Sequence, residues 1–261
     1  MVLDRFSLKG KVAIVTGAGR GIGKDIATAF AEAGADVACV DQNAESAHTV
    51  AEEVRGTGRR ALAVACDVRD EDQVAGMVES TRDHFGRIDI LVNNAGSAIF
   101  RPALQTSRRA WDAMLIENLT SAFLCSKAVG VVMLEQKSGS IISISSRESQ
   151  IPSLGMIAYG VAKAGVNSLT RTLAWELAPY VRVNAILPGG VLTEGSAPVL
   201  EPLKDRIIDG TPLKRMGLPE DIALAAIYLA SSASDWVTGK LFEIDGGIEF
   251  VPVTSKQVDG V

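Results

Sequence analysis

Short apolar runs alternate along the chain with longer segments whose apolar residues recur at helical spacing. Residues 12–15 form an uninterrupted apolar run, whereas Ala47, Val50, Ala51 and Val54 are spaced three and four residues apart. An apolar run of this kind is typical of a strand buried on both faces, and the second spacing predicts a one-sided helix. The pattern predicts strands at 11–16, 36–41, 61–67, 88–93, 140–145, 181–187 and 241–245, and helices at 21–33, 47–54, 74–85, 107–135, 158–178 and 219–231.

This regular alternation predicts the fold class. Parallel strands need crossover connections, so the pattern indicates an α/β protein with a doubly wound, seven-stranded parallel sheet flanked by helices. The chain of 261 residues is short for two full domains, and we expect one domain over 1–261, with its core at about 8–250 and a polar tail at 252–261. The long irregular segment 188–218 is rich in glycine, proline and threonine, which predicts a lid over a functional site.

Composition and charge argue against several classes of protein. The net charge is −5 and the chain has no basic run, which argues against nucleic acid as a partner. No apolar run approaches the roughly 20 residues of a membrane helix, and residues 1–10 do not resemble a secretory signal, so we expect no membrane partner. Three scattered cysteines do not suit a disulfide framework and favour a reducing compartment, the cytoplasm. His48 and His84 lack metal-ligand spacing, so no metal site is expected.

A glycine-rich turn follows the first predicted strand. Residues 16–23 read Thr-Gly-Ala-Gly-Arg-Gly-Ile-Gly and lead directly into a predicted helix. Glycines let the backbone approach a pyrophosphate, and a helix N-terminus offers free N–H groups and partial positive charge. The common G-x-G-x-x-G spacing is not met, because Ile occupies the position of its third glycine, and an ordinary tight turn is the alternative interpretation. The candidate dinucleotide-binding residues of this turn are Gly17, Arg20, Gly21, Ile22 and Gly23.

Residues at the ends of the next two predicted strands refine the choice of nucleotide. Asp41 ends the second strand, where a carboxylate accepts hydrogen bonds from an adenosine ribose and repels a 2′-phosphate. This favours NAD over NADP, with a solvated strand-end acid as the alternative. Arg20 is a counter-signal, because a cation near the ribose suits a 2′-phosphate. Asp67 and Val68 end the third strand and are candidates to hold the adenine, although Asp67 is equally well explained as a turn residue.

Two further motifs carry a family resemblance. The fourth predicted strand ends in Asn93-Asn94-Ala95-Gly96, and Tyr159-Gly160-Val161-Ala162-Lys163 follows later in the chain. Together with the glycine turn, in this order, they resemble the short-chain dehydrogenase/reductase family in its single-domain form. The likeness extends from about residue 8 to 250. It implies a Rossmann-type sheet of seven strands and nicotinamide chemistry.

The resemblance also implies site residues. The matching catalytic positions are Ser146, Tyr159, Lys163 and Asn118; the neighbouring Ser145 is an alternative to Ser146, but the 13-residue distance to Tyr159 selects Ser146. The resemblance implies a cofactor floor and a segment that closes on the nicotinamide end, while Tyr159 and Lys163 also contribute to the cofactor site. The floor residues are Asn94, Ala95 and Gly96, and those of the closing segment are Pro188, Gly189, Val191 and Thr193.

Tyr159 and Lys163 share one face of a predicted helix, because they are four residues apart. A free tyrosine has a pKa near ~10, so we expect the lysine ammonium and the cationic nicotinamide ring to lower it. Our hypothesis is that Tyr159 takes or gives the hydroxyl proton and that Ser146 stabilises charge on the substrate oxygen. Lys163 would also bind the nicotinamide ribose, and Asn118 would hold a water that relays protons. Taken singly, each residue has a purely structural explanation.

The sequence therefore predicts an NAD(H)-dependent oxidoreductase that interconverts a secondary alcohol and a ketone. One alternative is an NADP(H)-dependent ketoreductase such as a 3-oxoacyl carrier-protein reductase, and another is a non-catalytic NAD-binding scaffold. Candidate substrate-pocket residues are Ser97, Arg147, Glu148 and Gly190. Arg147 and Glu148 suggest a polar substrate, or else an ion pair that only shapes the loop. The resemblance implies a homotetramer, for which helices 107–135 and 158–178 and the segment 248–253 are candidate surfaces.

Overall fold

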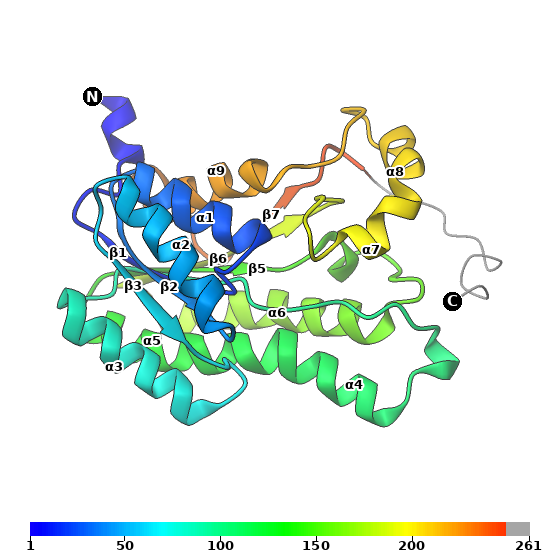
Figure 1. Cartoon of the computed structure of the whole chain (residues 1–261), viewed down its shortest axis with the longest axis horizontal. Coiled ribbons are helices and arrows are strands. Elements are labelled where there is room, and N and C mark those ends of the chain that lie inside the picture. Colours follow the sequence, from blue (N-terminus) through cyan, green and yellow to red (C-terminus); the bar gives the residue numbers. More distant parts are fainter. Residues whose placement is uncertain (249–261) are drawn as a thin grey trace.

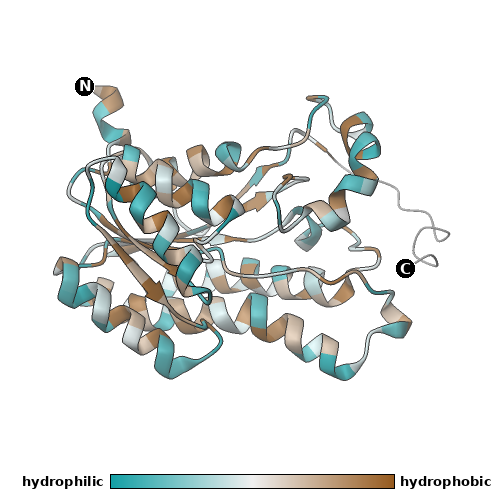
Figure 2. Cartoon of the chain, viewed as in Figure 1, coloured by the Kyte–Doolittle hydropathy of each residue, from teal (hydrophilic) through white to brown (hydrophobic). Residues whose placement is uncertain are grey.

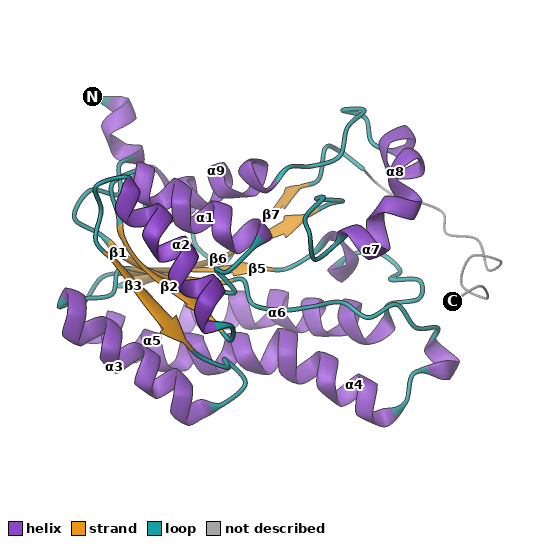
Figure 3. Ribbon diagram, viewed as in Figure 1, coloured by secondary structure: helices purple, strands orange, loops and turns teal. Residues whose placement is uncertain are grey.

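The centre of the molecule is a sheet of parallel strands. The structure is a computed structural model, and it describes residues 1–248. In this part of the chain the sheet has seven strands in the order β3-β2-β1-β4-β5-β6-β7, every neighbouring pair parallel, which confirms the predicted fold class (Figures 1 and 3). The strands are β1 (Val12–Thr16), β2 (Asp36–Asp41), β3 (Ala61–Ala65), β4 (Ile90–Asn93), β5 (Gly139–Ile144), β6 (Val181–Pro188) and β7 (Leu241–Ile244).

Helices cover both faces of the sheet, which accounts for strands that are apolar throughout. Along β1, Ala13 and Val15 pack into the core beneath α1, α2 and α9, while Val12 and Ile14 pack into the core beneath α3 and α5. Figure 2 shows the same distribution, with apolar residues along the strands and polar residues on the outward sides of the helices. The helices are α1 (Gly21–Glu32), α2 (Ala44–Gly56), α3 (Glu71–Phe85), α4 (Arg108–Leu115), α5 (Ser121–Gln136), α6 (Ile157–Glu176), α7 (Ala197–Leu200), α8 (Lys204–Gly210) and α9 (Pro219–Ala230).

One predicted helix is not continuous in the α-helical sense. Ser107 caps its start, since its Oγ accepts a hydrogen bond from the Ala110 N–H at 3.2 Å. The segment predicted at 107–135 then divides into α4 and α5, joined by a π-helical turn, η3 (Ile116–Thr120). A π turn inserts an extra residue into the helix and often marks a functional site. The helical stretch 108–136 is apolar and long enough for a membrane span by length and composition alone, yet α5 packs on β4 and β5.

Other element boundaries differ by a few residues from those predicted. β3 ends at Ala65 rather than at 67, because the chain turns there toward the N-cap Asp70 of α3. β4 begins at Ile90 rather than at 88, and α6 ends at Glu176, before the Ala178-Pro179 pair. Tail residues 252–261, and most of the expected interface segment 248–253, lie outside the described residues.

The irregular segment 188–218 folds over the carboxyl ends of the strands. It contains α7, a 3₁₀ turn η5 (Glu201–Leu203) and α8, which lie beyond β7 at the right of Figure 1. A parallel bridge between Val191 and Gly217 closes the base of this segment. The strand order reverses between β1 and β4, and the crevice at such a reversal is where open α/β sheets bind ligands.

Candidate functional site

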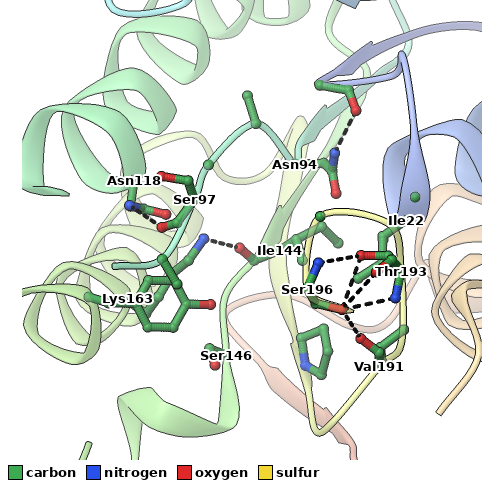
Figure 4. A pocket seen from close by; sticks show the side chains of 18 of the residues that line it. Ile22, Asn94, Ser97, Asn118, Ile144, Ser146, Lys163, Val191, Thr193 and Ser196 are labelled. Carbon is green, nitrogen blue, oxygen red and sulfur yellow. Dashed lines mark hydrogen bonds between the residues drawn. The ribbon is translucent and has the colours of Figure 1, made fainter. Parts of the chain in front are cut away.

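A large cavity lined by described residues lies at this crevice. Its volume is about 740 Å³, and it extends from the glycine turn after β1 to the segment 188–218. Its walls come from the carboxyl ends of β1 to β6 and from α6, so residues far apart in the sequence face one space (Figure 4). Every predicted site residue lines this cavity except Gly23, which lies buried behind the turn.

The glycine turn is shaped by close backbone contacts. Gly17 and Gly21 have positive φ values of 62° and 54°, which favour glycine. A Cβ at Gly23 would come within 2.2 Å of the Gly17 carbonyl oxygen, so only glycine fits where α1 meets the turn. Asn94 fastens this turn, because its Nδ2 donates to the carbonyl oxygens of Thr16 at 2.9 Å and Gly17 at 3.1 Å. The free N–H groups at the start of α1 therefore face a fixed cradle.

Asp41 and Arg20 take different positions around the cradle. The Asp41 carboxylate accepts hydrogen bonds from the N–H groups of Gly19 and Asn43, both at 3.0 Å, so it lies against the turn. The exposed Arg20 precedes α1, and its guanidinium lies 3.9 Å from where a Cβ on Gly195 would stand. Arg20 therefore extends toward the segment 188–218.

The turn that follows β3 contributes an ion pair that was not predicted. Arg69 binds the Asp67 carboxylate with its Nε at 2.8 Å and one terminal nitrogen at 2.7 Å, and both side chains line the cavity. This bidentate pair lowers the pKa of Asp67 through its hydrogen bonds with the guanidinium. Val68 is buried between them in the chain and lines the same end of the cavity. Any contact of Asp67 with an adenine would therefore be shared with Arg69.

Asn118 lies buried in the π turn and has an unused acceptor. Its Nδ2 donates to the carbonyl oxygens of Ser97 at 3.0 Å and Met114 at 3.1 Å, while its Oδ1 is buried without a hydrogen-bond partner. This oxygen faces the same space as Lys163, since a Cβ at Gly96 would lie 2.5 Å from Oδ1 and 3.5 Å from the lysine Nζ. A buried polar atom without a partner is costly, so a ligand or water suits this point.

Lys163 and Tyr159 lie one turn apart on α6, as expected from their spacing. The lysine Nζ donates to the Ile144 carbonyl oxygen at 2.8 Å and lies 5.6 Å from the centre of the Tyr159 ring. Burial lowers the pKa of Lys163 to about 8. In the chain by itself, the pKa of Tyr159 is raised rather than lowered. Desolvation raises it, a hydrogen bond with Ser146 partly opposes the rise, and the charge of Glu148 adds to it.

The structure distinguishes the two neighbouring serines. Ser146 lies beside the Tyr159 hydroxyl, and its Oγ accepts a hydrogen bond from the Glu148 N–H at 3.2 Å. Ser145 instead donates from its Oγ to the Lys163 carbonyl oxygen at 3.1 Å and to Asn167 Oδ1 at 2.7 Å. Ser146 is therefore the serine at the phenol, and Ser145 ties β5 to α6.

The segment after β6 is held by hydroxyl groups. Ser196 was not predicted as a site residue, yet its Oγ donates to the Val191 carbonyl oxygen at 2.8 Å and accepts from the Thr193 N–H at 2.9 Å (Figure 4). The Thr193-x-x-Ser196 spacing was the signal that could have identified it. Pro188 ends β6 at the cavity wall, and a Cβ at Gly189 would approach Asp245 to 2.7 Å.

The four predicted substrate-pocket residues surround the same end of the cavity as Tyr159. Ser97 donates from its Oγ to Glu117 at 2.8 Å, and Gly190 faces Ile207, since a Cβ there would approach it to 3.0 Å. The alternative of a loop-shaping pair between Arg147 and Glu148 needs correction. The nearly buried guanidinium of Arg147 forms ion pairs with Asp245 and, at 3.5 Å, Glu243.

Comparison with known proteins identifies the family. A family model described as "Enoyl-(Acyl carrier protein) reductase" matches residues 17–249. The chain belongs to the short-chain dehydrogenase/reductase family. It is 42% identical to the D-threitol dehydrogenase of Mycolicibacterium smegmatis (93% of this chain, 94% of the relative) and 41% identical to a 3-oxoacyl-[acyl-carrier-protein] reductase of Synechocystis (93% and 98%). The solved structure of a 7α-hydroxysteroid dehydrogenase with NADH and 7-oxo glycochenodeoxycholic acid has 35% identity and a TM-score of 0.92, covering 96% and 99% of the two chains.

This membership makes the chain an oxidoreductase of alcohol and ketone groups from a family that binds a nicotinamide cofactor. The residues present fit such a cofactor: the cradle at Gly17 and Gly23 admits close backbone approach, and Asn118 Oδ1 is an unsatisfied acceptor at the other end. Among residues 1–248, no group of three or more histidine, cysteine or acidic side chains is arranged to hold a metal ion.

Proposed function

We propose that this protein is an NAD(H)-dependent oxidoreductase that interconverts a secondary alcohol and a ketone by direct hydride transfer. The observation that carries the proposal is the convergence of Ser146, Tyr159, Lys163 and Asn118 on one cavity whose other end is the glycine cradle. Residues from three separate segments meet there, and a scaffold that only binds a nucleotide does not need them. When bound, the nicotinamide supplies a carbon that accepts or donates hydride.

The residues that we propose bind the cofactor follow one another along the cavity wall. The turn Gly17–Gly23 would hold the pyrophosphate at the start of α1, and Asp41 the adenosine ribose. Asp67 with Val68 would border the adenine, while Asn94, Ala95 and Gly96 form the floor. Pro188, Gly189, Val191 and Thr193 would close over the nicotinamide end. All of these residues except the buried Gly23 line the cavity, which supports the proposal.

The proton is handled by side chains of this chain. Tyr159 takes the proton from the alcohol oxygen during oxidation and returns it during ketone reduction. Ser146 donates a hydrogen bond to the substrate oxygen and stabilises negative charge that develops on it. Lys163 holds a positive charge close to the phenolate, and burial limits competition from water. Asn118 binds a water through its free Oδ1, which links Lys163 to solvent.

We infer NAD rather than NADP from the two charged groups at the cradle. The Asp41 carboxylate lies against the turn and would repel a 2′-phosphate, whereas the Arg20 guanidinium extends toward Gly195 in the segment 188–218. An NADP(H)-dependent ketoreductase stays the second candidate, because Arg20 lines the same cavity and the Synechocystis relative is a 3-oxoacyl-[acyl-carrier-protein] reductase.

We also propose how the chain assembles and where it acts. We infer a single catalytic domain over residues 1–261, with the segment 188–218 as its lid, acting in the cytoplasm on a small alcohol or ketone. Exposed apolar side chains on α5 and α6 support a homotetramer formed through these helices. They are Phe123, Val131 and Leu134 on α5, and Ile157, Val161 and Trp175 on α6.

A substrate screen tests the proposal directly. The purified protein is incubated with secondary alcohols and NAD⁺ or NADP⁺, and with ketones and NADH or NADPH, while nicotinamide absorbance is followed. We expect turnover with NAD(H) that Tyr159→Phe abolishes. Tight NADH binding without turnover of any alcohol or ketone would instead favour a non-catalytic scaffold.

A further inference from the structure

The turn that follows Ser146 is fixed to its surroundings at both ends. This 3₁₀ turn, η4 (Arg147–Ser149), begins with Arg147, whose guanidinium is paired with Asp245 just after β7. It ends with Ser149, whose Oγ accepts a hydrogen bond from Asn167 Nδ2 of α6 at 2.7 Å. Between these anchors the position of Glu148 is well defined.

Glu148 places a carboxylate in the cavity beside the reacting phenol. Its N–H donates to Ser146 Oγ at 3.2 Å, the residue lines the cavity, and its charge acts on Tyr159. Burial raises the pKa of Glu148, whereas Ser153 and Arg147 oppose that rise. The neighbouring wall of the cavity is mainly apolar, with side chains of Phe100, Ile151, Leu154 and Met156.

This carboxylate opposes the chemistry assigned to Tyr159. A negative charge nearby disfavours the phenolate, as its contribution to the raised pKa of Tyr159 shows. A hydrogen-bond donor bound to Glu148 would reduce this effect by occupying the carboxylate. The other carboxylate at this end, Glu117, already accepts the Ser97 hydroxyl at 2.8 Å and acts on Lys163 rather than on Tyr159.

We propose that Glu148 is a specificity-determining residue whose carboxylate accepts a hydrogen bond from a second hydroxyl of the substrate. The substrate class is then vicinal diols and polyols, with the corresponding hydroxyketones, because Ser146 and Tyr159 hold the reacting oxygen while Glu148 lies beside them. This inference rests on the proposed function.

Matched pairs of probes test the inference. The pairs are 2,3-butanediol against 2-butanol, and 1,2-cyclohexanediol against cyclohexanol, each with NAD⁺. In the unmodified protein we expect kcat/KM to favour the diol by about 10- to 100-fold, the range for one hydrogen bond to a charged group. Glu148→Leu should bring this ratio close to one, and Glu148→Gln, which keeps a carbonyl acceptor, should retain part of it.

A pH profile separates recognition from a structural role. For the mono-alcohols, Glu148→Leu should move the half-maximal kcat/KM to lower pH, because the Ser146 hydrogen bond then acts on the phenol without the opposing carboxylate. The control is Glu79→Gln on the exposed face of α3, which removes a carboxylate outside the cavity wall and should change neither measurement.

Each outcome decides the inference. A diol preference absent from the unmodified protein, or kept by Glu148→Leu, overturns it while leaving the proposed function intact. If the broader screen finds no alcohol or ketone that is turned over with either cofactor, the proposed function fails separately. The inference is then tested by the melting temperature, measured with NADH and with or without the diol. If the diol raises the melting temperature of the unmodified protein no more than that of Glu148→Leu, the inference is overturned.

Discussion

The two ends of the cavity are built from different parts of the polypeptide. At the cradle the surface is mostly backbone, drawn from the short stretch Gly17–Gly23 and locked by Asn94. At the reaction end the surface is side chains, and Asn118, Ser146 and Tyr159 come from three different elements. The proposed cofactor site therefore depends on local backbone shape, whereas the proposed catalytic site depends on assembly by the whole sheet. Substitutions should therefore separate the two functions.

The largest effect is expected at the phenol. Tyr159→Phe removes the proton donor and acceptor while keeping the ring, so kcat should fall by about 10²- to 10⁴-fold. The Kd for NADH, followed by its fluorescence, should change little because the cradle is untouched. If Tyr159→Phe turns over at the original rate, Tyr159 does not transfer the proton, and the proposed separation of cofactor binding from chemistry fails.

The paired serines sharpen the comparison within a single strand end. Ser146→Ala should lower kcat by about 10²- to 10³-fold, because a hydrogen bond to the substrate oxygen is lost. Ser145→Ala should leave kcat nearly unchanged and lower the melting temperature, since that hydroxyl only joins β5 to α6. The reverse result would show that the 13-residue spacing to Tyr159 selects the wrong serine.

The buried lysine predicts a pH dependence of stability without cofactor. The pKa of Lys163 is about 8 in the folded chain and 10.5 in the unfolded chain, so the unfolded chain binds more protons between these values. Stability from this group is therefore lowest below pH 8 and rises toward pH 10.5, by about 3 kcal/mol in all.

The measurement of this effect needs a difference between variants. Burial raises the pKa of three cysteine thiols to about 11 or 12, so their contribution to the stability of the protein falls as the pH rises above their usual range. These residues are Cys39, Cys66 and Cys125. Urea unfolding of the unmodified protein and of Lys163→Met, compared between pH 7.5 and 9.5, isolates the lysine. A constant difference in unfolding free energy across this range contradicts the assignment.

The smallest effect is expected at the cradle. Asp41→Asn removes the charge that disfavours a 2′-phosphate, so the ratio of the Kd values for NADP⁺ and NAD⁺ should fall by roughly 10- to 100-fold. Glu45→Gln, an exposed acid at the start of α2, is the matched control for a general change of charge. If both substitutions change the ratio of the two Kd values equally, Asp41 has no special role in the choice of cofactor. Neither substitution should change kcat.

The alternating fold, the glycine turn and the spacing of Tyr159 and Lys163 could be predicted from the sequence, because each depends on residues close together in the chain. Hydrophobic periodicity reports burial directly, and a helix places residues four apart on one face whatever surrounds it.

Features that depend on contacts between distant segments of the chain could be found only in the tertiary structure. The ion pair of Arg147 with Asp245 and the buried, unpaired Oδ1 of Asn118 both arise from packing. The sign of the pKa shift at Tyr159 belongs to the same class. Spacing predicted the attraction of a nearby ammonium, but desolvation depends on every atom around the phenol, and only the folded chain determines which of the two is larger.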